Sequence, residues 1–468
     1  MSLTEPPPPP PTTTTGALRS DAVGARHLVF FVVSAAAPLT VMAGFAPLAF
    51  LVGGQTAPVG YLAAGLVYAL FAVGFCAMSR HVSNAGAFYA YVTRGLGGAV
   101  GAGSALVAYV AYTLGEIGFC AAAGLFASIT LDDLAGIDVS WGACAVVLGL
   151  IVSVVAYCRV DVGARVLAVL LAGELGLLLA LAVAVLAKGA PEGLTLGGFD
   201  PSGWDASVLG SLFVITFVVY IGFEQTAVYA EEARDPRRTV PRATYVAVAL
   251  LALTYTVVSW VLLMAIGPSA LATALAGDPS QLVFALNQAY LGGFMTDVMQ
   301  VLIVTSFVAG VLALHNAGAR YLFALGRDRL LPASLGTTGA NSSPSRAVVV
   351  QSVLVVVALV GFGLSDLDPY TQVVIWTNTP TLVGVLFLQI LTSLAVIRFF
   401  ARNRTEEGVW QRLVAPALAT LALGVVLYLV CSKMGLLTGL GGWENLLINL
   451  PLVAAFVAGT VRGAVAAR

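Results

Sequence analysis

The sequence predicts an all-α integral membrane protein with twelve transmembrane helices, and three observations support this fold class. Hydrophobic residues make up 59% of the 468 residues and charged residues only 10%, far below the roughly one quarter that is usual in soluble domains. The apolar residues are gathered in long runs, and roughly 20 helical residues are enough to cross a hydrocarbon core about 30 Å thick. The basic residues are concentrated in alternate connections between these runs. The predicted spans are 28–53, 58–79, 100–129, 141–157, 163–188, 207–231, 242–266, 293–325, 346–364, 370–398, 412–431 and 443–462.

The distribution of basic residues predicts which side of the membrane each connection faces. When the connections are numbered alternately, all twenty arginines fall in one set, whereas both lysines, Lys188 and Lys433, fall in the other. Arginine-rich connections are retained in the cytoplasm, so the first set is expected inside, together with both termini. One helix too many or too few would destroy this pattern, which supports the count of twelve. We expect a multi-pass protein of the plasma (inner) membrane.

The first 25 residues are predicted to form a disordered cytoplasmic tail. Six consecutive prolines and four consecutive threonines dominate this segment. Such a low-complexity composition cannot bury a packed core.

Two spans contain residues that interrupt a helix. The first reads SAAAPLTVMAGFAPLAF, and its Pro38 and Gly44 predict unwinding near residues 40–46. The sixth reads FVVYIGFEQTAVYAEE and places Gly222 and Glu224 at mid-depth. Unwound backbone within a membrane is tolerated only where protein or a water-filled cavity satisfies its peptide groups. The freed amides suit an anion and the freed carbonyls suit a cation, so both ends of a zwitterion such as an amino acid would find partners.

The spacing of the two interruptions predicts an internal repeat. They lie five helices apart, and a unit of five helices followed by another must be inverted relative to it, as in many secondary transporters. The amphipathic connectors NAGAFYAYVTRGL and PSQLVFALNQAYLGG follow spans two and seven, on opposite sides of the membrane. We expect a first repeat over residues 26–190, a second over 205–400, and two additional helices within 410–464.

Two stretches resemble a known family. The segment YIGFEQTAVYAEEARDPRRTVPRATYVAV resembles the sixth-helix region of the amino acid–polyamine–organocation (APC) family, and ALHNAGARYLFALGRDRLLP resembles its eighth helix. The likeness extends over roughly residues 25–465. It implies the LeuT fold, secondary transport of amino acids or amines by alternating access, and in many members coupling to protons. The G-S/A-G-I-F motif that many members carry in the first helix is replaced by VMAGFAP here.

Residues around the two interruptions are the candidate substrate-binding residues. The carboxylate of an amino acid is expected to meet backbone amides of residues 42–45, and its amine the carbonyls of residues 36–38 and 219–221. Aromatic side chains nearby would form cavity walls or gates, with simple packing as the alternative. The substrate-binding candidates are Ala37, Thr40, Met42, Ala43, Gly44, Phe45, Tyr112, Glu116, Tyr220, Ile221, Gly222 and Phe223.

Three glutamates lie well inside predicted spans. A charged side chain at the bilayer centre costs roughly 2.5–3.5 kcal/mol on insertion scales, so each is a functional candidate, with a permanently protonated structural glutamate as the alternative. Glu174 aligns with a fifth-helix lysine of proton-coupled members of the resembled family and is the leading protonation site. Glu224 follows the broken YIGF and is expected to act in gating, and Glu116 could neutralise a cationic substrate. His315 and Trp376 complete the coupling and gating candidates.

Other classes of function are disfavoured. The five cysteines and three histidines have no metal-ligand spacing, and neither a nucleotide-binding glycine loop nor a Ser/His/Asp set is visible. We therefore expect no enzyme, catalytic residue, metal site, cofactor or nucleic-acid partner. The expected partners are an amino acid or amine substrate, membrane lipid and a proton, with sodium as the alternative ion because Thr305 and Ser306 could help form a sodium site. The alternatives are a polyamine or other organic amine transporter and an amino acid exchanger.

Overall fold

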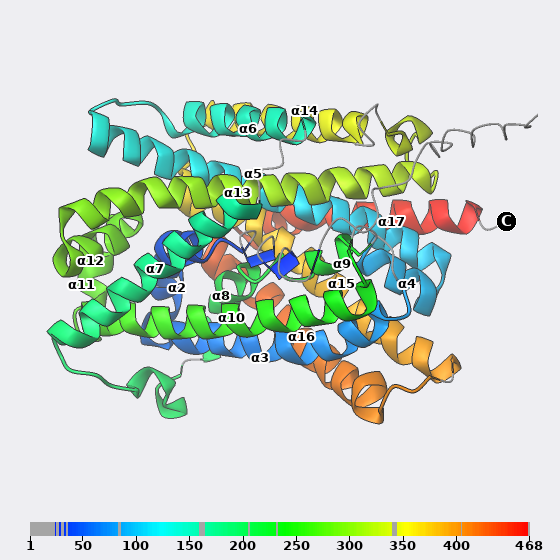
Figure 1. Ribbon diagram of the computed structural model, residues 1–468, viewed down its shortest axis with the longest axis horizontal. Helices are drawn as coiled ribbons and strands as arrows, with labels where there is room; N and C mark the ends of the chain where they lie inside the picture. Colours follow the sequence, from blue (N-terminus) through cyan, green and yellow to red (C-terminus); the bar gives the residue numbers. More distant parts are fainter. Residues whose placement is uncertain are drawn as a thin grey trace, which may run out of the picture.

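A computed structural model of the chain describes residues 24, 28–29, 32–33, 36–82, 86–158, 164–204, 206–230, 233–338, 344–403 and 405–466. Within these ranges the chain is built of helices, and the long ones run mostly along the longest axis of the molecule (Figure 1). The predicted disordered tail, apart from Gly24, lies outside the described residues.

The helices keep the order in which the apolar runs follow one another. Short π-helical turns at Thr40–Phe45, Pro369–Val373 and Trp410–Val414 lead into α2, α15 and α16. The α-helices are α2 (Ala46–Gly53), α3 (Ala57–Ser79), α4 (Phe88–Leu96), α5 (Gly98–Ala135), α6 (Trp141–Cys158), α7 (Ala164–Lys188), α8 (Ala206–Val218), α9 (Gln225–Val228), α10 (Pro236–Ile266), α11 (Leu271–Leu275), α12 (Leu282–Leu291), α13 (Gly293–Arg327), α14 (Ser345–Gly363), α15 (Val374–Arg402), α16 (Ala415–Thr438) and α17 (Gly442–Ala466).

Among the described residues, ten helical stretches are long and apolar enough to cross a membrane. One of them, Thr40–Ser79, contains most of the first predicted span and all of the second, and the other nine each match one predicted span. The sixth predicted span corresponds to α8 and α9, and α8 contains a shorter apolar stretch, Val208–Val218. Each of the twelve predicted spans therefore has a helical counterpart.

Helices that the predicted repeat relates to each other pack together. α3 packs against α10, α5 against α13, and α6 against α14. Figure 1 shows α6 and α14 along one edge and α3 and α10 towards the opposite edge. Helix α5 is central to this arrangement, because it also packs against α4, α15 and α17.

Two glycines with positive φ each lie between a short helix and a long one. Gly97 (φ 108°) ends α4 and precedes α5, and Gly292 (φ 86°) ends α12 and precedes α13. Glycine adopts this conformation without the steric cost that a Cβ atom would add. The helices that they end, α4 and α12, lie towards opposite ends of the molecule (Figure 1).

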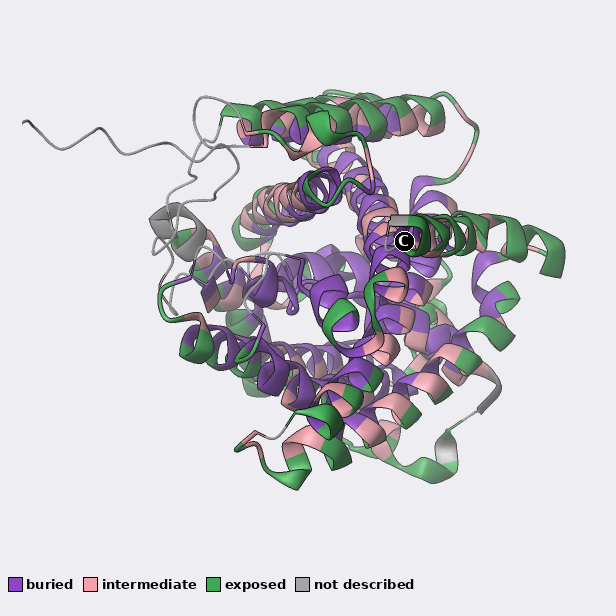
Figure 2. Cartoon of the chain, turned by 90° about the vertical axis from the view of Figure 1, so that its right-hand side faces the viewer, coloured by how far each residue is buried: buried purple, intermediate pink, exposed green. Residues whose placement is uncertain are grey.

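The buried residues gather in the middle of the bundle, and the exposed ones lie on the outer helices (Figure 2). Many exposed side chains are apolar: Val357 on α14 and Leu446 on α17 are each 65% exposed. Large apolar surfaces of this kind mark contact with lipid or with another protein rather than with water. The outer helices therefore present the kind of surface that a membrane-embedded protein requires.

Candidate functional site

The sixth predicted span is interrupted where the sequence predicted it. Helix α8 ends at Val218, and α9 begins at Gln225. The residues between them form turns, and Gly222 has φ 124°, a conformation that side chains larger than hydrogen rarely adopt. The interruption is buried, apart from the half-buried Ile221.

The carboxylate of Glu224 holds this interruption together. Its two oxygens accept the backbone N–H of Gly222 at 3.1 and 3.0 Å. The hydroxyl of Tyr112, on α5, donates a further hydrogen bond to Glu224. Glu224 is fully buried, and Tyr112 is 1% exposed. Two candidates far apart in the sequence thus meet at the second interruption.

The first span is interrupted earlier than predicted, so the expectation of unwinding at residues 40–46 is wrong. Ala37 has φ 44°, and a helix starts at Pro38 and passes through the π-helical turn Thr40–Phe45 into α2. Proline suits the first turn of a helix, because the N–H that it lacks would have had no partner there. Gly44 instead permits close packing: a Cβ atom there would lie 3.2 Å from the Phe307 ring.

This shift also corrects which amides are available to a substrate. The N–H of Val41 bonds the carbonyl of Ala37 at 3.0 Å, and that of Ala46 bonds the carbonyl of Val41. Residues 42–45 thus lie inside the helix, where amides pair within the helix itself. The amides of the first turn, at Leu39 and Thr40, are those that face the interruption.

The carboxylate of Glu174 lies at this helix start. Its Oε2 accepts the N–H of Leu39 at 3.4 Å, and the side chain is 4% exposed. The hydroxyls of Thr40 and Ser306 are buried and have no hydrogen-bond partner among the described residues. Thr305, which the sequence paired with Ser306 in a candidate sodium site, donates a hydrogen bond to the carbonyl of Leu302.

Tyr255 on α10 joins the two interruptions. Its hydroxyl lies 2.8 Å from the carbonyl oxygen of Ala36 and 3.5 Å from that of Val219. Each of these carbonyls lies where the chain enters one of the two interruptions. The sequence had predicted that both would face the amine of the same substrate. Sequence reasoning missed Tyr255, because a tyrosine in a largely apolar span is typical of packing.

The candidate Tyr220 and two tyrosines that the sequence did not single out, Tyr61 and Tyr68, surround this junction. Tyr220 donates to the carbonyl of Tyr61 at 2.8 Å, and its ring contacts that of Tyr255 with centroids 5.2 Å apart. Tyr68 lies against both Tyr220 and Phe223. The interruptions are thus enclosed by an aromatic cluster that shields their peptide groups.

The remaining candidates do not all join the site. Phe45 stacks on Phe119 with ring centroids 5.5 Å apart. Glu116 and His315 contact each other at 2.6 Å, and among the described residues neither side chain has a hydrogen bond to a residue of either interruption. Trp376 is half-buried and donates to the carbonyl of Thr438, which packs α15 against α16.

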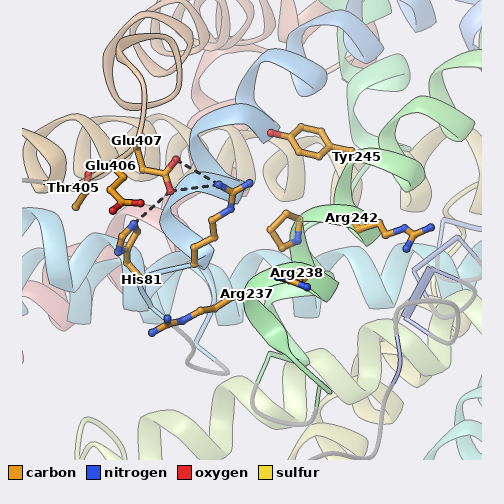
Figure 3. A pocket seen from close by; sticks show the side chains of 10 residues that line it. His81, Arg237, Arg238, Arg242, Tyr245, Thr405, Glu406 and Glu407 are labelled. Atoms are coloured by element: carbon orange, nitrogen blue, oxygen red, sulfur yellow. Dashed lines mark hydrogen bonds and ion pairs between the residues drawn. The ribbon is translucent and has the colours of Figure 1, made fainter.

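A separate cavity of about 940 Å³ lies where the end of α3 and the start of α10 meet the connection between α15 and α16 (Figure 3). Its lining includes four arginines and two glutamates. Glu407 lies 3.5 Å from Arg80 and 3.6 Å from His81, which ties α3 to that connection. None of the lining residues belongs to either interruption, so this cavity is distinct from the candidate site.

Comparison with known proteins identifies the family. Residues 27–446 match the family described as amino acid permease. The chain is similar to a branched-chain amino acid permease of Lactococcus lactis, at 29% identity over 172 residues, which are 37% of this chain and 35% of that protein. It is also similar to the histidine permease of Saccharomyces cerevisiae, at 25% identity over 243 residues (48% of this chain and 39% of that protein). The vacuolar cationic amino acid transporter 2 of Arabidopsis thaliana is 27% identical over 300 residues (60% and 45%).

These alignments span less than half the length of each of the three relatives. The family match is longer and includes both interruptions. It confirms the resemblance that the motifs of the sixth and eighth predicted spans indicated. The chain therefore belongs to the amino acid permease family, within the APC superfamily, which is a family of transporters rather than enzymes.

Proposed function

We propose that this protein is a secondary active transporter that imports amino acids across the plasma membrane, coupled to protons, by alternating access. The junction of the two interruptions at Tyr255 carries this proposal, because it brings helix ends from both interruptions together in a buried place. Helix ends of both polarities at one site match a solute that bears a carboxylate and an amine.

The proposed architecture is the LeuT fold, with twelve spans and both termini in the cytoplasm. Residues 26–190 and 205–400 would form the two inverted repeats, and residues 410–464 the two additional helices. The packing of α3 on α10, α5 on α13 and α6 on α14 supports this assignment. So do Gly97 and Gly292, which end α4 and α12, two helices that lie towards opposite ends of the molecule.

The substrate is placed between the interruptions. Its carboxylate would lie at the helix start formed by Leu39 and Thr40, where the helix dipole favours an anion. Its amine would take the place of the Tyr255 hydroxyl at the carbonyls of Ala36 and Val219. Ala37, Tyr220, Ile221, Gly222 and Phe223 would line this space.

Glu174 is the proposed coupling residue. Its carboxylate already accepts the N–H of Leu39 and so lies at the position proposed for the carboxylate of the substrate. Two carboxylates side by side repel each other, whereas a protonated Glu174 adds no charge. Protonation would therefore allow the substrate to bind, which makes proton and substrate travel together.

Glu224 is the proposed gating residue. It ties the second interruption to α5 through Tyr112, so breaking these hydrogen bonds would release the half-helix that α9 begins. This gives Glu224 a role in motion rather than in direct contact with the substrate.

A reconstituted transport assay tests the proposal. Purified protein is first screened by thermal shift against amino acids and polyamines, and the best hit is then used for uptake into proteoliposomes. We expect uptake of an amino acid that an inward proton gradient accelerates. Uptake driven by a sodium gradient alone would overturn proton coupling, and stimulation only by internal amino acid would indicate an exchanger. Uptake of polyamines without amino acids would favour the amine transporter, whose main argument, a free Glu116, is weakened by its contact with His315.

Glu174→Gln should separate transport from the proton gradient. Glutamine resembles protonated glutamate and carries no charge, so the substrate should bind without a proton. We expect uptake that no longer responds to the gradient, while exchange of internal for external substrate persists. Glu444→Gln, which changes an exposed glutamate on α17 in the same way, should behave as wild type. Unchanged gradient dependence in Glu174→Gln would exclude Glu174 as the coupling residue.

A further inference from the structure

A second buried cluster of polar groups lies between α5, α13 and α14. Glu116 Oε1 is 2.6 Å from His315 Nδ1, and both side chains are 1% exposed. Gln351 donates to the other oxygen of Glu116 at 2.7 Å and to the hydroxyl of Thr113 at 3.3 Å. Burying polar and ionisable groups within a membrane costs free energy unless they are paired. A cluster of them is therefore a candidate for a functional site.

The hydrogen bonds fix where the protons lie. Ser352 donates its single hydroxyl hydrogen to the carbonyl of Val348 at 2.9 Å, so its oxygen can only accept from His315 Nε2, 3.3 Å away. Nε2 therefore carries a hydrogen. Gln351 donates to Oε2 of Glu116, so the carboxyl proton, if present, is on Oε1. At 2.6 Å two lone pairs would repel, hence one further hydrogen lies between Oε1 and Nδ1.

This hydrogen sets the charge of the pair. Whether it belongs to the carboxyl group or to the imidazole, Glu116 and His315 together are neutral. Its removal leaves one negative charge, and His315 can then satisfy Glu116 only by moving its hydrogen to Nδ1. Ser352 must in that case turn its hydroxyl from Val348 to Nε2. Loss of one proton would thus rearrange the contacts that connect α13 with α14.

Among the residues that the structure describes, neither Glu116 nor His315 forms an ion pair with any other charged side chain. Tyr109 and Cys120 are the titratable neighbours on α5. Helix α6 contributes Cys144 and has no charged residue, and α15 faces this part of α5 with threonine and asparagine side chains. Arg320 on α13 lies over the ring of Tyr229, 4.4 Å from its centroid, and Arg346 is exposed at the start of α14.

We propose that Glu116 and His315 form a proton-binding site that is separate from Glu174 and from the substrate. Glu116 lies one helical turn from Tyr112, which holds Glu224 at the second interruption. A proton on the pair keeps α5, α13 and α14 joined, and its release loosens α5 where it contacts that interruption. The rate of transport then depends on this second proton. Only this last step rests on the proposed transport function.

Infrared difference spectroscopy of the purified protein between acidic and alkaline pH tests the site directly, without transport. We expect Glu116→Gln and His315→Gln each to remove the same signal of a buried titrating group. The double variant should lose no more of the infrared signal than either single variant, because the two residues share a single proton. Glu444→Gln, the matched control on an exposed carboxyl, should leave that signal in place. A spectrum that neither variant alters, or losses that add up in the double variant, would overturn the proposal.

Uptake measured across the same pH range then tests the consequence for transport. We expect the wild-type rate to change with pH over the range where the infrared signal titrates, and Glu116→Gln to lose this component. If one of the variants Glu116→Gln and His315→Gln fails to fold, the other is used, because each removes one of the two residues that share the proton. Absence of uptake in every protein, with the infrared signal intact, would contradict the proposed function alone. An unchanged pH profile in a variant that lacks the signal would contradict the link to transport.

Discussion

The hydroxyl of Tyr112 decides how firmly the second interruption is held. Tyr112→Phe removes its hydrogen bond to Glu224 while leaving the ring in place. A buried acceptor that loses its partner costs roughly 1–3 kcal/mol. We therefore expect a lower thermal unfolding midpoint and slower uptake, measured on purified and reconstituted protein.

Tyr157→Phe provides the matched control, because Tyr157 is 54% exposed on α6. This variant should match wild type in both measurements. Equal stability of Tyr112→Phe and wild type would contradict the role given to the hydrogen bond.

Single residues were predictable from the sequence where a side chain is unusual for its surroundings. A glutamate in an apolar span is such a case, and Glu174 and Glu224 both lie at the interruptions. Their partners were not predictable, since no spacing relates Tyr112 to Glu224, and Tyr255 resembles an ordinary packing residue. Glu116 was recognised as unusual, but its partner His315 lies 199 residues away in the chain.

At the scale of elements, Gly222 permits the turn between α8 and α9. Gly222→Ala would place a side chain at φ 124°, and strained backbone of this kind costs about 1–3 kcal/mol. We expect a lower unfolding midpoint and a loss of substrate-induced stabilisation, both measured by thermal shift.

Gly424→Ala on α16 is the corresponding control. A Cβ atom there meets nothing within 4 Å, and alanine is a better helix former than glycine. The control should be as stable as wild type or more stable. If Gly222→Ala behaved in the same way, the turn would not need glycine.

The position of the first interruption shows why element boundaries were harder to predict than the existence of the elements. Pro38 was interpreted as breaking the helix, and the unwound segment was placed after it. In the structure Pro38 starts a helix and the unwound residue, Ala37, precedes it. Proline is common both where a helix breaks and where one begins. Only the packing of neighbouring side chains, such as Phe307 against Gly44, distinguishes these two cases.

At the scale of the whole molecule, the segregation of arginine from lysine predicts the orientation in the membrane. Glu444→Cys and Arg402→Cys, in a background without the five native cysteines, place single thiols at exposed positions. A membrane-impermeant maleimide applied to intact cells should label the first, which is expected outside, and not the second.

Labelling of both thiols after the cells are permeabilised is the control for reactivity. The reverse pattern in intact cells would invert the topology and place the arginines outside.

Whole-molecule features were the most predictable, because they rest on many residues at once. Each predicted span has a helical counterpart, since a run of about 20 apolar residues has few alternatives in a membrane. The sequence also predicted that spans one and six are interrupted. The sequence could not predict that α6 packs closely against α14, where Gly142 approaches Gly363. Glycine in a helix can serve close packing, end the helix or have neither role, and sequence alone does not distinguish these cases.

Tyr255 and Glu174 have a consequence for affinity. In the structure these two side chains satisfy the helix ends: a phenol hydroxyl stands where we propose an ammonium group, and an internal acid where we propose a carboxylate. In the proposed mode of binding, an amino acid would displace both groups, exchange existing contacts for similar ones and gain little net free energy. Binding at the proposed site would then be weak and rapidly reversible, and the substrate would be released readily on the far side of the membrane.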